Sequence, residues 1–431
     1  MERVLLIGLK RARQTLANTQ TSLEELSRLV ETAGGSVVDR TIQPRARFDP
    51  ATLIGRGKVV EVAERVRRGR LQTVVFDDDL SPAQQRNLER EIPAKILDRT
   101  HLILDIFAQR ARTREGILQV EFAQLSYRLP RLGGLGVKLS QQVGGIGTRG
   151  PGERMLEVDR RHLRERIRRL RVEIERIQDH RERARENRLQ VPLPQVALIG
   201  YTNAGKSTLL NTLTSRGSTS SPRAGRVHPE LVEGQIYADD KLFATLDPTT
   251  RRVKLPGGRV VLFTDTVGFI QKLPHHLVAA FRATLEEVTR ANLLVHVVDA
   301  SNPRHPEQMR TVAQVIKDLG GEKIPALTAY NKADRLGGEE RQALDRRTDL
   351  RISATSGEGI ETFLKTVEAE LDKDLIEVSF ELPYGRRDLL SGIYKTGRIL
   401  EETPAREGTK LRVRIDPAHW RKIAHQLKRL L

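Results

Sequence analysis

The stretch that decides the fold is QVALIGYTNAGKSTLLN, residues 195–211. A short apolar segment, Gln195–Ile199, leads into a loop that begins and ends near glycines, and Lys206 opens a helical pattern. A strand, a glycine-containing loop and a helix in this order are typical of a phosphate-binding loop. Backbone N–H groups of such a loop surround phosphate oxygens, and the helix N-terminus adds its positive end. The sequence therefore predicts a nucleotide site in an α/β domain.

Two side chains of this loop have distinct expected roles. Lys206 should reach the β- and γ-phosphate oxygens, where it would take part in catalysis, and Ser207 should ligate Mg²⁺. The loop residues that we assign to nucleotide binding are Gly200, Tyr201, Thr202, Asn203, Ala204, Gly205, Lys206, Ser207 and Thr208.

A second apolar strand, expected over Arg259–Phe263, leads into another nucleotide motif. Asp265 is placed to hold Mg²⁺ through water, and the N–H of Gly268 can sense a γ-phosphate, which also makes Gly268 a catalytic candidate. The residues assigned to the site here are Asp265, Thr266, Val267 and Gly268.

Two further strands, expected over Leu293–Val298 and Ile324–Ala329, deliver residues that can recognise a base. A carboxylate at Asp334 can accept both the ring N–H and the amino group of guanine, whereas adenine has no such pair of donors. This favours GTP over ATP. Since parallel strands end on one edge of a sheet, these motifs should meet there. The base-site residues are Asn331, Lys332, Asp334, Ser353, Ala354 and Thr355.

Composition sets limits on the rest of the molecule. The 431 residues exceed one hydrophobic core, so several domains are expected. Lys and Arg number 74 against 56 acids, a net charge of +18 that favours RNA as a partner. There is no cysteine, which excludes disulfides and thiol metal sites. No apolar stretch is long enough to span a membrane, and we expect a cytoplasmic protein, with peripheral membrane association left open.

Pattern changes divide the chain into four expected domains. Residues 1–112 alternate short apolar runs with helical patterns, which predicts a small α/β domain. Residues 113–190 predict a long helical hairpin, and residues 195–372 a GTPase domain with a mostly parallel sheet and helices on both faces. An insertion near 215–234 should form a surface loop. Residues 373–431 predict a small α+β appendage.

Two glycine-containing stretches outside the GTPase domain have alternative interpretations. The connection in the hairpin, residues 133–152, carries Lys138 and Arg149 and is predicted either to contact RNA or to act as a flexible linker. Gly55–Lys58 resembles part of a phosphate loop, but its spacing is wrong, so a helix-entry turn is favoured over a second nucleotide site.

Beyond these single motifs, longer strings of residues resemble the HflX family of ribosome-associated GTPases over nearly the whole chain. The strings that carry the resemblance are Asp98–Thr100, Arg110–Gly116, Gly144–Glu153, Gly200–Ser207, Phe243–Arg251 and Asp265–Ile270. The resemblance implies that the protein binds the large ribosomal subunit and its ribosomal RNA, and that GTP controls ribosome binding or subunit separation under stress. We expect a monomer.

The resemblance also supplies the first switch segment. It implies that Thr245 completes the Mg²⁺ shell when GTP is bound and takes part in catalysis, whereas from the residues alone Thr249 or Thr250 are equal candidates. The residues added to the nucleotide site on this ground are Phe243, Ala244, Thr245, Leu246 and Asp247. The metal ligands expected in total are Ser207, Thr245 and Asp265.

One position leaves a gap in the predicted mechanism. Ras-like enzymes orient the attacking water with a glutamine after the glycine of the second motif, but here Phe269 follows Gly268. We therefore expect GTP hydrolysis to be slow alone and faster on ribosomes. The alternatives are an RNA-remodelling or RNA-processing enzyme with a regulatory GTPase module, and a scaffold that binds GTP without hydrolysing it.

Overall fold

The computed structural model describes residues 1–12, 14–134, 151–188, 193–217, 242–243, 246–272, 287–346, 350–386, 389–390, 393 and 397–428. The chain forms two compact units. Unit 1 consists of Met1–Gln178, Lys241–Leu246 and Gln271–Phe281, and unit 2 of Asp179–Asp240, Asp247–Ile270 and Arg282–Leu431.

Unit 1 contains a four-stranded sheet in the order β2-β1-β3-β4, in which every pairing is parallel. Its strands are β1 (Glu2–Lys10), β2 (Gly35–Pro44), β3 (Thr73–Phe76) and β4 (Lys95–Asp98), and its helices are α1 (Leu16–Thr32), α2 (Arg56–Gly69), α3 (Pro82–Glu91) and α4 (Arg99–Arg110). The central strand β1 is buried continuously from Val4 to Leu9. Such a run is typical of a parallel strand covered on both faces, and it confirms the small α/β domain.

The helices of this sheet begin where the sequence supplies capping groups. Ser81 and Gln84 form a reciprocal capping box at the start of α3, and the side chain of Asp98 accepts the N–H of His101 at the start of α4. Gly55 lies at the N-cap of α2, so Gly55–Lys58 forms the entry turn of that helix.

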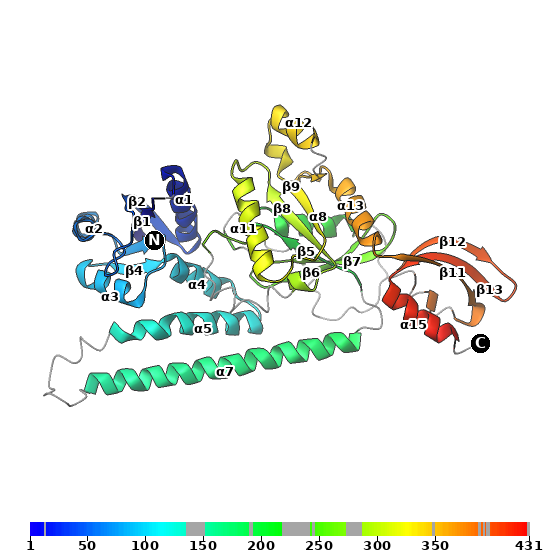
Figure 1. The fold of residues 1–431 in the computed structure, drawn as a ribbon, viewed down its shortest axis with the longest axis horizontal. Coiled ribbons are helices and arrows are strands. Elements are labelled where there is room, and N and C mark those ends of the chain that lie inside the picture. The colour runs from blue at the N-terminus through cyan, green and yellow to red at the C-terminus, as the bar shows by residue number, and fades with distance from the viewer. Residues whose placement is uncertain are drawn as a thin grey trace. The chain divides into compact units, whose positions relative to one another are not determined.

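The predicted helical hairpin is formed by α5 (Arg114–Arg128), followed by the short η1 (Leu129–Gly134), and by the long α7 (Pro151–Arg188) (Figure 1). Two ion pairs join the helices, Arg114 with Glu173 and Glu121 with Arg166. The later residue in α5 pairs with the earlier residue in α7. The two helices are therefore antiparallel. Leu170 is fully buried between these pairs. The glycine-rich connection from residue 135 to 150 lies outside the described residues.

Unit 2 contains a six-stranded sheet in the order β10-β9-β8-β5-β7-β6, in which only β6 is antiparallel to its neighbour. Its strands are β5 (Gln195–Ile199), β6 (Thr249–Lys254), β7 (Val260–Asp265), β8 (Leu293–Asp299), β9 (Ala326–Asn331) and β10 (Leu350–Arg351). The accompanying helices are α8 (Lys206–Gly217), α11 (His305–Asp318), η2 (Ala333–Arg335), α12 (Gly338–Arg346) and α13 (Ile360–Asp372).

Helices cover both faces of this sheet, as predicted. Val297 packs in a core with side chains of α8 and α13, whereas the next residue, Val298, packs with Met309 of α11 and Leu344 of α12. Successive side chains of a strand point to opposite faces, so the two helix pairs lie on opposite sides. The insertion expected near 215–234 lies outside the described residues from residue 218 onward.

The strand expected over Ile324–Ala329 is shifted. Strand β9 begins at Ala326 and ends at Asn331. The N–H of Ile324 bonds to Gly321 in a turn, and Pro325 has no N–H for a strand ladder. The correction makes Asn331 the last residue of the strand.

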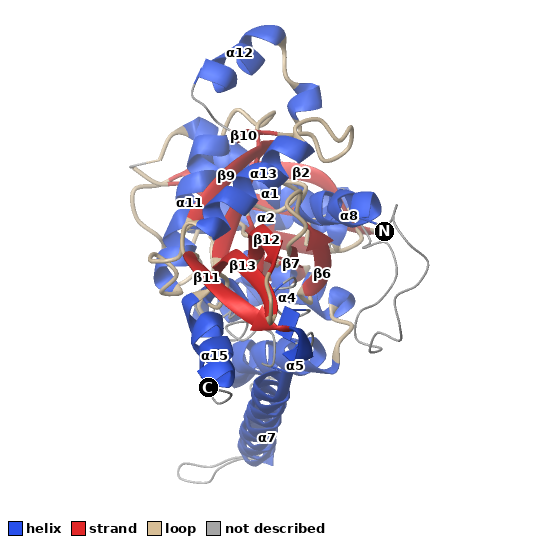
Figure 2. Ribbon diagram, turned by 90° about the vertical axis from the view of Figure 1, so that its right-hand side faces the viewer, coloured by secondary structure: helices blue, strands red, loops and turns tan. Residues whose placement is uncertain are grey.

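The described part of the appendage at the C-terminus contains a three-stranded antiparallel sheet and the helix α15, which confirms the α+β prediction (Figure 2). Its elements are β11 (Ile376–Pro383), η3 (Tyr384–Arg386), β12 (Arg398–Pro404), β13 (Gly408–Ile415) and α15 (Pro417–Lys428). Trp420 of α15 packs on Phe380, with ring centroids 4.9 Å apart. In the described part of the chain, no helix combines the length and apolarity needed to cross a membrane.

Candidate nucleotide-binding site

The loop between β5 and α8 requires glycine at two positions. Gly200 has a φ of +154°, and a Cβ there would lie 2.3 Å from the carbonyl oxygen of Val297. Gly205 has a φ of +92°, and its Cβ would lie 2.2 Å from the side-chain nitrogen of Asn331. Both contacts are far shorter than real Cβ contacts, so neighbouring strands fix the shape of this loop.

Lys206 lies folded over the loop rather than extended into water. Its Nζ donates to the carbonyl oxygens of Gly200 and Tyr201 at 3.2 and 2.9 Å, and the residue is only 6% exposed. Burial lowers the pKa of Lys206 to about 8, although the charge of Asp265 opposes the shift. An ammonium group so poorly hydrated gains from an incoming anion, such as a phosphate.

An acid and a hydroxyl meet beside this lysine. The Oγ of Ser207 donates to Oδ2 of Asp265 at 2.6 Å, and Asp265 is fully buried at the end of β7. The next hydroxyl, Thr266 Oγ1, donates to the carbonyl oxygen of Leu198 at 2.7 Å and so joins β7 to β5. Hydroxyl and carboxylate oxygens are the ligands that Mg²⁺ prefers, so this donor set fits the metal.

Backbone hydrogen bonds tie the second motif to the loop. Thr202 donates its N–H to Phe269 O at 2.8 Å, and Phe269 donates its N–H to Gly200 O at 3.1 Å. A Cβ on Gly268 would lie 2.8 Å from Cα of Thr202 and 3.1 Å from Nζ of Lys206. Only glycine therefore fits at position 268. The side chain of Phe269 is buried and has no group that could hydrogen-bond a water.

The amide of Asn331 connects the phosphate side of the site to the base side. Its Nδ2 donates to the carbonyl oxygen of Ala204 at 2.8 Å, and its Oδ1 accepts the N–H of Ala354 at 2.9 Å. On the base side, Ser353 Oγ donates to Asp334 Oδ1 at 2.6 Å. One side chain thus links three predicted segments, which we call the Asn331 bridge.

Comparisons with known proteins agree with this arrangement. The family descriptions that match are "GTP-binding GTPase N-terminal" at residues 20–108, "GTP-binding GTPase Middle Region" at 110–188, "50S ribosome-binding GTPase" at 195–332 and "HflX C-terminal domain" at 340–430. GTPase HflX of Caldanaerobacter subterraneus subsp. tengcongensis is 44% identical over 396 residues, which cover 92% of this chain and 88% of that protein. The chain belongs to the HflX family of GTPases.

This HflX-family chain is also similar to proteins from other organisms. GTPase HflX of Escherichia coli is 41% identical over 94% of this chain and 92% of that protein. Among solved structures, a GTP-binding protein from the archaeon Sulfolobus solfataricus in complex with GDP is 22% identical. That match covers 86% of this chain and 99% of the archaeal chain, with a TM-score of 0.42.

The predicted site residues of the HflX-family chain fall into three groups. The structure brings together the loop from Gly200 to Thr208, the motif from Asp265 to Gly268, and the base-site residues on β9 and after β10, all at the carboxyl edge of one sheet. Leu246 is buried and Asp247 is half-buried. Phe243 is buried in unit 1, and Ala244 and Thr245 lie outside the described residues.

Two residues that shape this site, Asp299 and His296, were not assigned from the sequence. Asp299 accepts through its Oδ2 a hydrogen bond from Nζ of Lys332 at 2.8 Å, and Lys332 has a left-handed φ of +63°. Asp299 ends β8 directly opposite Asn331 of β9, and its place directly after the expected strand Leu293–Val298 was the signal that could have indicated it. His296 lies on β8, where burial and the nearby Lys206 lower its pKa to about 4. No sequence signal marks His296.

Proposed function

We propose that this GTPase binds and hydrolyses GTP at the site described above and associates with the large ribosomal subunit through its basic surface. The observation that carries the nucleotide part is the Asn331 bridge, since it joins the phosphate loop to the base-recognition segments. Support for the ribosomal part comes from the family description at residues 195–332 and from the net charge of +18.

Guanine recognition is assigned to the segments around Asp334. The carboxylate of Asp334 accepts the two guanine donors, held in orientation by the hydroxyl of Ser353. Ala354 and Thr355 close the base pocket, and Asn331 and Lys332 hold it against the phosphate loop. ATP is rejected because adenine has no pair of donors that the carboxylate of Asp334 could accept.

Phosphate binding is assigned to the loop between β5 and α8. Lys206 exchanges its carbonyl partners for β- and γ-phosphate oxygens, and Gly268 donates its N–H to the γ-phosphate. Ser207 and Asp265 hold Mg²⁺, with Thr245 as the further ligand from the first switch segment. When bound, Mg²⁺ neutralises charge that develops between the two phosphates.

Hydrolysis is proposed to be slow in the isolated protein. An in-line water needs a hydrogen-bonding group to orient it, and the buried ring of Phe269 supplies none. We infer that a ribosome orders the switch segments or supplies the missing group. GTP then controls ribosome binding or subunit separation, which serves the cell under stress.

The remaining assignments follow from the same proposal. We divide the chain into an N-terminal α/β domain at 1–112, a helical hairpin at 113–190, a GTPase domain at 195–372 and an appendage at 373–431. The arginine-rich α7 and the adjoining loop contact ribosomal RNA. The protein acts as a monomer in the cytoplasm, with any membrane contact being peripheral.

Phosphate release from GTP tests the proposal, measured for the purified protein alone and with large ribosomal subunits added. ATP is the control nucleotide, and small subunits are the control particle. We expect slow GTP turnover alone, strong stimulation by large subunits only, and no ATP turnover. Brisk turnover without ribosomes and no stimulation with them would refute the ribosomal part while leaving the GTPase assignment intact.

A further inference from the structure

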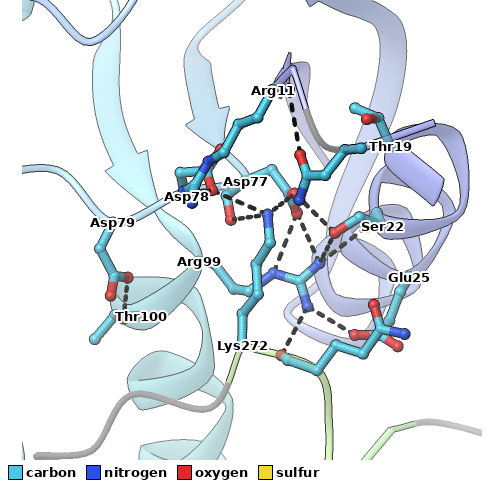
Figure 3. A network of polar contacts seen from close by, with 12 residues as sticks. Arg11, Thr19, Ser22, Glu25, Asp77, Asp78, Asp79, Arg99, Thr100 and Lys272 are labelled. Carbon is cyan, nitrogen blue, oxygen red and sulfur yellow. Dashed lines mark hydrogen bonds and ion pairs between the residues drawn. The ribbon is translucent and has the colours of Figure 1, made fainter. Parts of the chain in front are cut away.

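A buried arginine in unit 1 connects helix α1, strand β3 and the segment that begins at Gln271 (Figure 3). Arg99 is only 1% exposed, and its Nε and Nη2 donate to Oδ1 of Asp77 at 3.2 and 2.7 Å. Its Nη1 donates to Glu25 at 2.7 Å and to the carbonyl oxygen of Gln271 at 3.3 Å. Arg99 thus holds the backbone of a residue 172 positions away in the sequence.

Lys272 adds a second cation to the same carboxylate. Its Nζ donates to Oδ2 of Asp77 and, at 3.1 Å, to Oδ1 of Asp78, and Figure 3 shows the side chain directed at this pair. Burial alone would raise the pKa of Asp77, but Arg99 and Lys272 outweigh it and lower this pKa to about 2. Lys272 also has a left-handed φ of +54°. These contacts fix both the side chain and the backbone at 272.

The anchored pair lies close in sequence to the nucleotide motif. Lys272 follows Gly268 by four residues, a length that spans at most about 14 Å. Phe269, within this stretch, exchanges backbone hydrogen bonds with Gly200 and Thr202 of the phosphate loop. If Gly268 shifts toward a γ-phosphate, it therefore strains either the hydrogen bonds of Phe269 to the phosphate loop or the contacts that hold Gln271 and Lys272.

The first switch segment contacts helix α4, the helix that also carries Arg99. The ring of Phe243 packs edge-on against Phe107 of α4, with centroids 4.7 Å apart, and Phe243 is 2% exposed. Phe243 precedes Thr245 by two residues. Helix α4 thus carries Arg99 at its start and Phe107 near its end, each holding residues next to one predicted nucleotide sensor.

We propose that Asp77 and Arg99 are positioning residues for the response to the bound nucleotide, which act by holding Gln271 and Lys272 and so set where Gly268 can move. This inference rests on the proposed contact of Gly268 with the γ-phosphate. It couples the nucleotide state to the sheet of unit 1. Thermodynamic linkage makes this coupling reciprocal. If exchanging GDP for GTP changes the affinity of unit 1 for a ligand by some factor, that ligand changes the ratio of GTP to GDP affinity by the same factor.

Lys272→Met in the full-length chain tests the coupling, because the lysine is 32% exposed and its loss leaves the Arg99 contacts in place. The matched control is Arg11→Gln, which removes another cation from Asp78, bound at 3.0 Å, without touching the 271–272 segment. Lys272→Arg serves as the rescue variant. Amide hydrogen exchange is compared between GDP and a non-hydrolysable GTP analogue, in peptides covering residues 73–79 and 99–107.

In wild type, Arg11→Gln and Lys272→Arg, exchange in these peptides should differ between the two nucleotides. Lys272→Met should reduce the difference clearly, because only the Arg99–Gln271 contact then holds the segment, and it should change the ratio of the two affinities about fivefold or more. A Lys272→Met protein that keeps the wild-type difference would overturn the proposal, as would a wild type with no difference despite binding both nucleotides. A protein that fails to bind guanine nucleotides would instead refute the proposed function itself. No ribosomes are needed in any arm.

Discussion

At the scale of single residues, the site depends on a few polar contacts that choose the base and hold the phosphates. Ser353 orients the carboxylate of Asp334, and Lys206 lies on loop carbonyls that a triphosphate would replace. Each contact concerns one functional group of the substrate. Substitutions at these positions should therefore change specificity or proton balance without changing the fold.

Asp334→Asn should change the preferred nucleotide from GTP to XTP. The new amide can still accept the hydroxyl of Ser353 through its oxygen, while its NH₂ donates to the carbonyl that xanthine has in place of the guanine amino group. Competition binding with the two nucleotides measures the preference, and Asp299→Asn, which alters the partner of Lys332 and Ser301 and leaves Asp334 unchanged, is the control. An unchanged preference for GTP would exclude Asp334 as the base-recognition residue.

Nucleotide binding should be accompanied by proton uptake at alkaline pH. Because the pKa of Lys206 is about 8 in the free protein, about half of the molecules carry a neutral amine at pH 8, and phosphate oxygens should raise this pKa on binding. Uptake should approach half a proton at about pH 8 and decline toward neutral pH. Calorimetric titration in two buffers of different ionisation enthalpy measures it, and equal heats in both would contradict the expected rise in pKa.

At the scale of secondary-structure elements, the parallel strands and glycine loops were predictable, but contacts between distant elements were not. The order apolar strand, glycine loop and helix is local, so residues 195–211 indicated the nucleotide site directly. The contacts of Asp77 with Lys272 and of Asn331 with Ala204 join residues far apart in the chain. Charge alone gave no reason to pair one of many lysines with one of many aspartates. The predicted strand Ile324–Ala329 began two residues before β9, because the prediction followed the apolar residues and ignored that Pro325 has no N–H for the strand ladder.

Asp77→Asn should destabilise unit 1 strongly, because it leaves the buried guanidinium of Arg99 with one carboxylate fewer. The expected loss is about 3 kcal/mol in the free energy of unfolding. Urea unfolding followed by circular dichroism measures it, with Asp39→Asn as control, since Asp39 pairs with Arg65 at the surface and should contribute less than about 1 kcal/mol. Equal effects of the two variants would show that Asp77 is not a stabilising centre.

The same carboxylate predicts a pH dependence. The pKa of Asp77 is lowered in the folded state, so its stabilisation is complete above the ordinary aspartate range and is lost as pH falls toward about 2. Wild type should therefore lose stability in acid more steeply than Asp77→Asn does below about pH 4. Parallel slopes for the two proteins would contradict this assignment.

At the scale of the whole molecule, charge should control association with the ribosome. A protein with a net charge of +18 that contacts RNA phosphates releases counterions on binding, so its affinity should fall as salt rises. Between 50 and 200 mM KCl we expect a decrease of about tenfold or more, measured by co-sedimentation with large subunits at a fixed nucleotide concentration. Salt-independent binding would point to an apolar protein surface on the subunit instead.

The packing of Trp420 on Phe380 also makes this tryptophan an intrinsic fluorescent probe. The sequence contains one tryptophan, and it belongs to the small antiparallel sheet at the C-terminus. Its emission should report the unfolding of that sheet and be blind to events confined to the GTP site. After Trp420→Phe, a tryptophan placed near either switch segment would be the only tryptophan of the protein, so tryptophan emission could be assigned to one chosen position.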